Sequence, residues 1–109
     1  MAIQLPPAIE RYIQIENSGA LEAVPECFLA DAIVRDEGQT YEGVPAIENW
    51  MATTKRKYGH TIAPLEVADR DGQTILKVRL AGNFPGSPIT VNFGFVLAGG
   101  KICSLKIGG

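Results

Sequence analysis

The sequence predicts an α+β fold in which three helices in the first half pack on a curved, mainly antiparallel β-sheet. Three helical patterns, with apolar residues three and four positions apart, precede residue 60, and residues 61–107 alternate with a period of two. A sheet with one apolar face must be covered, and the helices can cover it. Because a long sheet twists, it can curl around them and leave a conical pocket. The expected architecture is therefore a cone-shaped two-layer domain.

Size and composition predict one domain over residues 1–109. The 109 residues are 46% hydrophobic and 20% charged, with a net charge of −2, which is typical of a globular protein with a real core. Ten Lys and Arg residues and a pI of about 5.3 give no electrostatic signature of nucleic-acid binding. We find no signal-peptide pattern and no apolar run of membrane-spanning length, so we expect no membrane partner and a cytoplasmic protein.

The first half begins with two helices and a small hairpin. Residues 8–16 have one apolar face, and the run 17–19 supplies a helix stop and a new N-cap. A second, short helix is predicted from the spacing of Leu21, Val24 and Phe28, although Pro25 limits its length. The members of the first helical face are Ile9, Tyr12, Ile13 and Glu16. Residues 32–36 and 40–42 are then expected to pair across the turn at 37–39.

A third helix is expected over residues 46–58, with Pro45 near its start and Gly59 just past its end. Its apolar stripe consists of Ile47, Trp50, Met51, Thr54 and Tyr58. Lys55, Arg56 and Lys57 lie in the last turn, where cations interact favourably with exposed carbonyls, and we prefer this role to anion binding.

Strands are expected over 61–69, 74–84, 89–97 and 101–107, separated by turns rich in Gly, Pro and Asp. The third of these presents a continuous apolar face made of Ile89, Val91, Phe93, Phe95 and Leu97. In the fourth, Cys103, Leu105 and Ile107 are expected to face inward. Polar residues on the other face predict a wet homodimer contact through the outer sheet face. They are Lys77, Arg79, Thr90, Asn92 and Lys106.

Two polar residues among apolar neighbours, Tyr12 and Asp36, are candidates for acid/base chemistry. Asp36 either faces a pocket or caps the following turn in solvent. Tyr12 is otherwise a core aromatic whose hydroxyl finds a partner. His60 is expected to be an exposed loop residue rather than a proton shuttle. Two separate cysteines, Cys27 and Cys103, with a single histidine, predict buried reduced thiols and no metal site.

The order of elements resembles the nuclear transport factor 2-like superfamily, which contains ketosteroid isomerases and small polyketide cyclases. Several segments resemble the first half of ketosteroid isomerases, with no gap needed between Tyr12 and Asp36. They are Arg11-Tyr12-Ile13, the Gly-Ala-Leu-Glu-Ala-Val run at 19–24, the run from Ala30 to Asp36, and Gly43 with Ile47. The resemblance implies a general-base role for Asp36 and an oxyanion-stabilising role for Tyr12.

The same resemblance places Phe93, with Asn92 beside it, where the family has a second oxyanion donor. It implies an isomerase or cyclase, without a cofactor, that moves a proton next to the carbonyl of a small hydrophobic ligand. The alternative, motivated by Phe93, is a non-catalytic ligand-binding or dimerisation module. Whether the protein is an enzyme is left open. A pocket for a flat apolar ligand would be lined by Phe28, Val34, Trp50, Phe84, Phe93 and Phe95.

Overall fold

Six strands form one sheet in the computed structural model, which describes residues 4–108. Their order is β2-β1-β6-β5-β4-β3, and all neighbours are antiparallel except β1 and β6. The strands are β1 (Phe28–Asp36), β2 (Gln39–Glu42), β3 (Thr61–Arg70), β4 (Gln73–Ala81), β5 (Ile89–Ala98) and β6 (Lys101–Ile107). The mainly antiparallel sheet of the α+β prediction is therefore confirmed.

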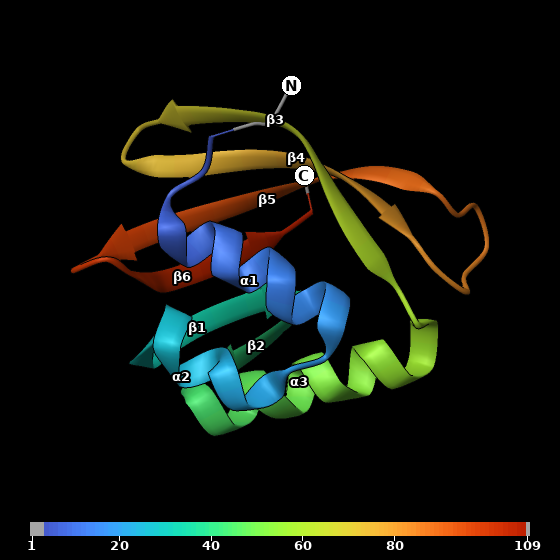
Figure 1. Ribbon diagram of the computed structural model, residues 1–109, viewed down its shortest axis with the longest axis horizontal. Coiled ribbons are helices and arrows are strands. Elements are labelled where there is room, and N and C mark those ends of the chain that lie inside the picture. Colours follow the sequence, from blue (N-terminus) through green and yellow to red (C-terminus); the bar gives the residue numbers. More distant parts are fainter. Residues whose placement is uncertain (1–3, 109) are drawn as a thin grey trace.

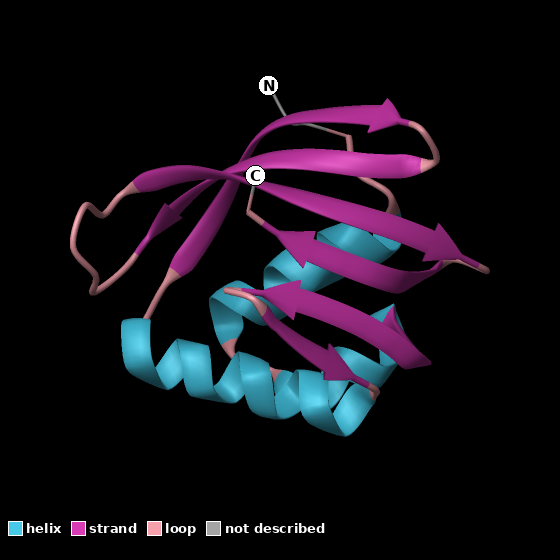
Figure 2. Cartoon of the chain, turned by 180° about the vertical axis from the view of Figure 1, so that it is seen from behind, coloured by secondary structure: helices cyan, strands magenta, loops and turns pink. Residues whose placement is uncertain are grey.

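Three helices, α1 (Pro7–Ser18), α2 (Val24–Cys27) and α3 (Val44–Tyr58), pack on one face of this sheet. A 3₁₀ turn, Leu21–Ala23, leads into α2. Helix α1 lies in front of the central strands, whereas α3 runs beside β1 and β2 (Figure 1). Seen from behind, α1 lies beyond the strands, so the opposite face of the central sheet is not covered by it (Figure 2). No helix in residues 4–108 has the length and apolar character needed to cross a membrane.

Local sequence explains where α1 and α3 begin and end. Both carry Pro in the first helical positions, where the missing N–H costs no hydrogen bond. Both end at a left-handed glycine: Gly19 (φ 78°) donates to the carbonyl of Ile15, and Gly59 (φ 55°) donates to that of Lys55. These ends place the last turn of α1 and the start of β3 near each other, which matters for the cavity described below.

The second helix, α2, is shorter than predicted from the spacing of Leu21, Val24 and Phe28. Phe28 has extended dihedral angles (φ −112°, ψ 143°) and is the first residue of β1, so its expected place on a helical face is wrong. Strand β1 thus begins four residues before the expected position 32. Its pairing with β6 shifts between Phe28 and Ile33, which breaks the alternation by which a strand is recognised in sequence.

A second irregularity changes which residues of β6 face the core. The register between β5 and β6 shifts between Val96 and Leu97, so Val96 pairs with Ser104 and Leu97 with Ile102. Ile102 and Leu105 are buried as a result, whereas Cys103 is partly exposed. The prediction that Cys103 is a buried inward residue is therefore wrong, because a bulge cannot be read from the alternation of the sequence.

The polar residues of the outer sheet face lie side by side as predicted. Lys77 pairs in register with Asn92, and Arg79 pairs with Thr90. Lys77 also forms an ion pair with Glu66 at 3.2 Å. A homodimer through this face stays a prediction.

Candidate active site

A cavity of about 240 Å³ opens between the helices and the sheet. Its wall combines apolar and aromatic side chains with carboxylates and one imidazole. The lining residues are Glu16, Asp36, Glu37, Trp50, Thr54, Tyr58, His60, Leu80, Phe84, Ile89, Phe93 and Ile107. Ligand sites are mostly apolar hollows with a few polar groups that orient the ligand, and this cavity has that character.

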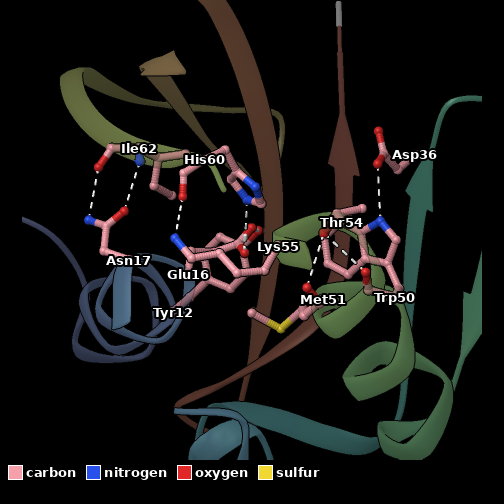
Figure 3. Close-up of polar contacts among 10 residues, drawn as sticks. All are labelled: Tyr12, Glu16, Asn17, Asp36, Trp50, Met51, Thr54, Lys55, His60 and Ile62. Carbon is pink, nitrogen blue, oxygen red and sulfur yellow. Dashed lines mark hydrogen bonds and ion pairs between the residues drawn. The ribbon is translucent and has the colours of Figure 1, made fainter. Parts of the chain in front are cut away.

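Asp36 is the last residue of β1 and lines the cavity. The turn that follows it uses two left-handed residues, Glu37 (φ 53°) and Gly38 (φ 76°), to return the chain into β2. The indole N–H of Trp50, on the buried face of α3, donates to Asp36 Oδ2 at 3.0 Å (Figure 3). The structure thus places Asp36 on the cavity wall with a partner, and its catalytic role stays a prediction.

The pKa of Asp36 is raised above its ordinary value of 3.8. Burial is the largest cause, because removing a carboxylate from water disfavours its charged form. The hydrogen bond from Trp50 acts in the opposite direction, and the negative charges of Glu37 and Glu16 raise the pKa further. A carboxylate with a raised pKa binds a proton more tightly, which suits a general base.

A second polar cluster joins Tyr12, Glu16 and His60, of which Glu16 and His60 line the same cavity. The Tyr12 hydroxyl donates to Glu16 Oε2 at 2.6 Å, and His60 Nε2 lies 3.3 Å from Glu16 Oε1 (Figure 3). All three residues are buried, at 0%, 4% and 6% exposure. Tyr12 does not line the cavity. Its hydroxyl donates a hydrogen bond to Glu16 and does not point to a ligand in the cavity. The prediction that His60 is an exposed loop residue is wrong.

The burial of His60 follows from how the chain leaves α3. The side chain of Asn17 pairs with the backbone of Ile62 in both directions, at 3.0 and 2.8 Å, and holds the start of β3 against the end of α1. Gly82 lies against the same segment, so close that a Cβ there would be 2.8 Å from the Tyr58 carbonyl oxygen. These contacts hold the segment that contains His60 beside Glu16.

Three of the six predicted pocket residues line the cavity: Trp50, Phe84 and Phe93. The other three, Phe28, Val34 and Phe95, are buried in the core instead, with at most 1% exposure. The ring of Tyr12 packs against two of them, with centroid distances of 5.9 Å to Phe28 and 5.6 Å to Phe95. The structure thus places these three residues in the core and not on the wall of this cavity.

The sequence interpretation missed Glu16 and His60 as site residues. Glu16 had a visible signal, because a carboxylate four positions after Tyr12 shares its buried helical face. His60 had none, since a residue after a helix-ending glycine is usually exposed. Among residues 4–108 no cluster of three or more His, Cys, Asp or Glu side chains has the arrangement of a metal site.

The two cysteines differ in environment. Cys27 is 1% exposed, and burial raises the pKa of its thiol to about 12. Cys103 is partly exposed. Neither lines the cavity.

Comparison with solved structures gives close matches over nearly the whole chain. A proposed polyketide cyclase from Sinorhizobium meliloti is 32% identical, with 94% of each chain covered and a TM-score of 0.90. A protein of ketosteroid isomerase-like fold from Catenulispora acidiphila, in complex with trimethylamine, is 17% identical, with 97% of this chain and 87% of that chain covered and a TM-score of 0.83. The epoxide hydrolase/cyclase-like enzyme SalBIII is 20% identical, with 93% and 86% covered and a TM-score of 0.77. No protein-family model and no curated protein sequence matches the chain.

Proposed function

Because this chain belongs to the nuclear transport factor 2-like superfamily, among its ketosteroid isomerase-like and polyketide cyclase-like members, we propose that it moves a proton next to the carbonyl of a small ligand bound in the cavity. The observation that carries this proposal is the position of Asp36. It is a carboxylate of raised pKa, held on one side by Trp50 and lining an otherwise largely apolar cavity. We propose Asp36 as the general base.

The cavity wall supports a ligand that is mostly apolar and small. Leu80, Phe84, Ile89 and Phe93 offer carbon surface to it. A volume of about 240 Å³ is below the usual range of roughly 300–1,000 Å³ for drug-sized ligands. We therefore propose a one- or two-ring carbonyl compound in the cavity between sheet and helices, in preference to a four-ring steroid.

The second candidate is a ligand-binding module that does not catalyse a reaction. It is favoured by Phe93, an apolar side chain where the resemblance implies an oxyanion donor, and by the Tyr12 hydroxyl, which donates to Glu16. Losing one oxyanion donor costs on the order of 3 kcal/mol of transition-state stabilisation. A member lacking both would bind ligands but exchange protons slowly.

Exchange of the ligand's α-protons in deuterated buffer tests the two candidates. A suitable probe is 3-cyclohexen-1-one, whose isomerisation to the conjugated ketone is seen by ultraviolet absorbance and whose α-exchange is seen by NMR. Asp36→Asn should slow both by about 100-fold. Asp31→Asn, an exposed carboxylate on the same strand that does not line the cavity, should leave them unchanged. Saturable binding of the ketone with no enzyme-dependent exchange would instead support the binding module.

A further inference from the structure

The buried pair of Glu16 and His60 has no part in the proton transfer proposed above, although both residues line the cavity. Their side chains are 4% and 8% exposed, and the pair joins α1 to the residue that precedes β3. Buried ionisable groups are costly unless they are paired, and here the Glu16 carboxylate has two partners. The arrangement needs an explanation beyond packing.

The hydroxyl of Tyr12 fixes one oxygen of Glu16. Burial, followed by the negative charge of Glu16 and the hydrogen bond to it, raises the pKa of Tyr12 well above its ordinary value. The tyrosine therefore keeps its proton, and its hydroxyl donates a hydrogen bond to Oε2. Oε1 is left to face the ring of His60. Since a carboxylate only accepts hydrogen bonds, Nε2 of His60 must carry a proton to bond with Oε1.

The other ring nitrogen, His60 Nδ1, is buried and has no hydrogen-bond partner among the residues that the structure describes. Buried polar atoms are rarely left without a partner, and such exceptions often have a functional reason. Two other donors on the cavity wall are already used. The indole N–H of Trp50 donates to Asp36, and the hydroxyl of Thr54 donates to the carbonyls of Trp50 and Met51.

We propose that His60 is a further catalytic residue, an imidazolium whose Nδ1–H donates to the ligand's carbonyl oxygen. This inference rests on the proposed function, with Asp36 as base. The C–H bond at the α-carbon breaks as its proton passes to Asp36. The electron pair forms the C=C bond of an enol, and the carbonyl oxygen takes the proton from Nδ1. The neutral enol later returns that proton to Nδ1 while the Asp36 carboxyl protonates carbon, so both residues regain their starting states.

In this arrangement Glu16 and Tyr12 are positioning residues. Glu16 holds Nε2 and supplies the charge opposite the imidazolium, in the way that a carboxylate orients the histidine of a hydrolase triad. Other charged or titratable groups share this cavity or contact His60, and Glu37, in the turn after β1, is one that lines the cavity. Asp36 of β1 interacts electrostatically with His60. From α3, Tyr58 lines the same cavity, and the ammonium of Lys55 donates to the backbone carbonyl of His60.

The first test needs no variant, because the chain contains a single histidine. Its ¹⁵N imidazole resonances are therefore assigned without ambiguity. Saturating cyclohexanone labelled with ¹³C at the carbonyl should shift the Nδ1 resonance and move the ketone carbon downfield, as a hydrogen bond to oxygen does. If saturating ketone leaves the His60 resonances in place, the proposal is overturned, whatever is found for Asp36.

Two substitutions test the roles of the two ring nitrogens of His60 separately. Glutamine at position 60 (His60→Gln) can still reach Glu16 but has no donor at the place of Nδ1, whereas His60→Asn keeps an amide donor near Nδ1 and loses the contact with Glu16. We expect His60→Gln to lower kcat for 3-cyclohexen-1-one by about 100-fold and to remove the carbonyl shift, and His60→Asn to restore part of both. Asp31→Asn, an exposed carboxylate that does not line the cavity, should change neither.

The outcomes distinguish this proposal from the proposed function. If His60→Gln stays within about twofold of wild type while Asp36→Asn abolishes exchange, His60 is not the acid and the proposed function stands. If the ketone shifts Nδ1 and His60→Gln removes the carbonyl shift, but no exchange occurs in wild type, the contact between His60 and the ligand is supported and the catalytic role of both residues fails.

Discussion

Removing the hydroxyl of Tyr12 tests the buried chain from Tyr12 to Glu16 to His60. In Tyr12→Phe the ring and its contacts with Phe28 and Phe95 remain, and only the 2.6 Å hydrogen bond to Glu16 is lost. A hydrogen bond to a charged group contributes about 1.5–3 kcal/mol, and the loss is felt in full when the remaining acceptor is buried. Glu16 is 4% exposed, so we expect the free energy of unfolding to fall by about 2 kcal/mol.

Unfolding entropy converts this loss into a temperature. At about 2.1 cal/mol/K per residue, 109 residues give roughly 0.23 kcal/mol/K, so Tm should fall by about 9 °C. Differential scanning calorimetry measures this shift, and urea titration gives the free energy independently. Tyr41→Phe is the matched control, because its hydroxyl makes no hydrogen bond to another described residue and its change should be below about 0.5 kcal/mol.

A double-mutant cycle with Glu16→Met, which leaves no side-chain oxygen to accept from Tyr12, isolates the contact from other effects of each substitution. We expect a coupling energy of about 1.5–3 kcal/mol between positions 12 and 16. A coupling below about 0.5 kcal/mol would show that the hydroxyl and the carboxylate do not meet in solution. The assignment of Tyr12 as a positioning residue would then be refuted.

Three more predictions use other parts of the structure. Because the folded-state pKa of Asp36 is raised, the stability that this carboxyl contributes is complete below its unfolded pKa and is lost as pH rises through the folded pKa. Thermal unfolding of Asp36→Asn should therefore show a gain in stability over wild type at about pH 7 that is absent at about pH 3, and an equal gain at both would contradict this account. A water-soluble disulfide reagent should label Cys103 quickly in the native protein and Cys27 only after unfolding, as mass spectrometry of digests would show. Gly82→Ala should lower stability by about 1–3 kcal/mol, because its Cβ would lie 3.0 Å from Cα of His60; an unchanged Tm would mean that the segment relaxes freely.

Most of the fold could be predicted because its signals are local. Proline at the start and glycine at the end mark α3, and alternation marks β4 and β5. The errors lie where strands depart from regular pairing. The register shift between β1 and β6 leaves two successive residues, Ala30 and Asp31, exposed. The register shift between β5 and β6 near Leu97 places Ile102 inward in place of Cys103. A bulge is decided by the partner strand, so a single strand's sequence does not reveal it.

The candidate site was predictable only in part, for a related reason. Asp36 and Trp50 are 14 positions apart and each had a local signal, as the end of a strand and as part of a helical apolar stripe. Glu16 and His60 are 44 positions apart, and nothing near His60 in sequence indicates that α1 covers it. The pocket residues show the same limit, since the placement of Phe95 in the core depends on the ring of Tyr12 packing against it.

Consecutive residues of α1 make the two polar contacts that place one wall of the cavity. Glu16 meets His60, and Asn17 pairs with the backbone of Ile62. Strand β3 is at the edge of the sheet and has only β4 beside it, so its position relative to α1 depends on these contacts as well as on apolar packing. Hydrogen bonds constrain distance and angle more narrowly than apolar contacts do. The last turn of α1, ended by Gly19, therefore sets where His60 lies relative to Asp36, and the acid and base proposed here are positioned by different layers of the fold.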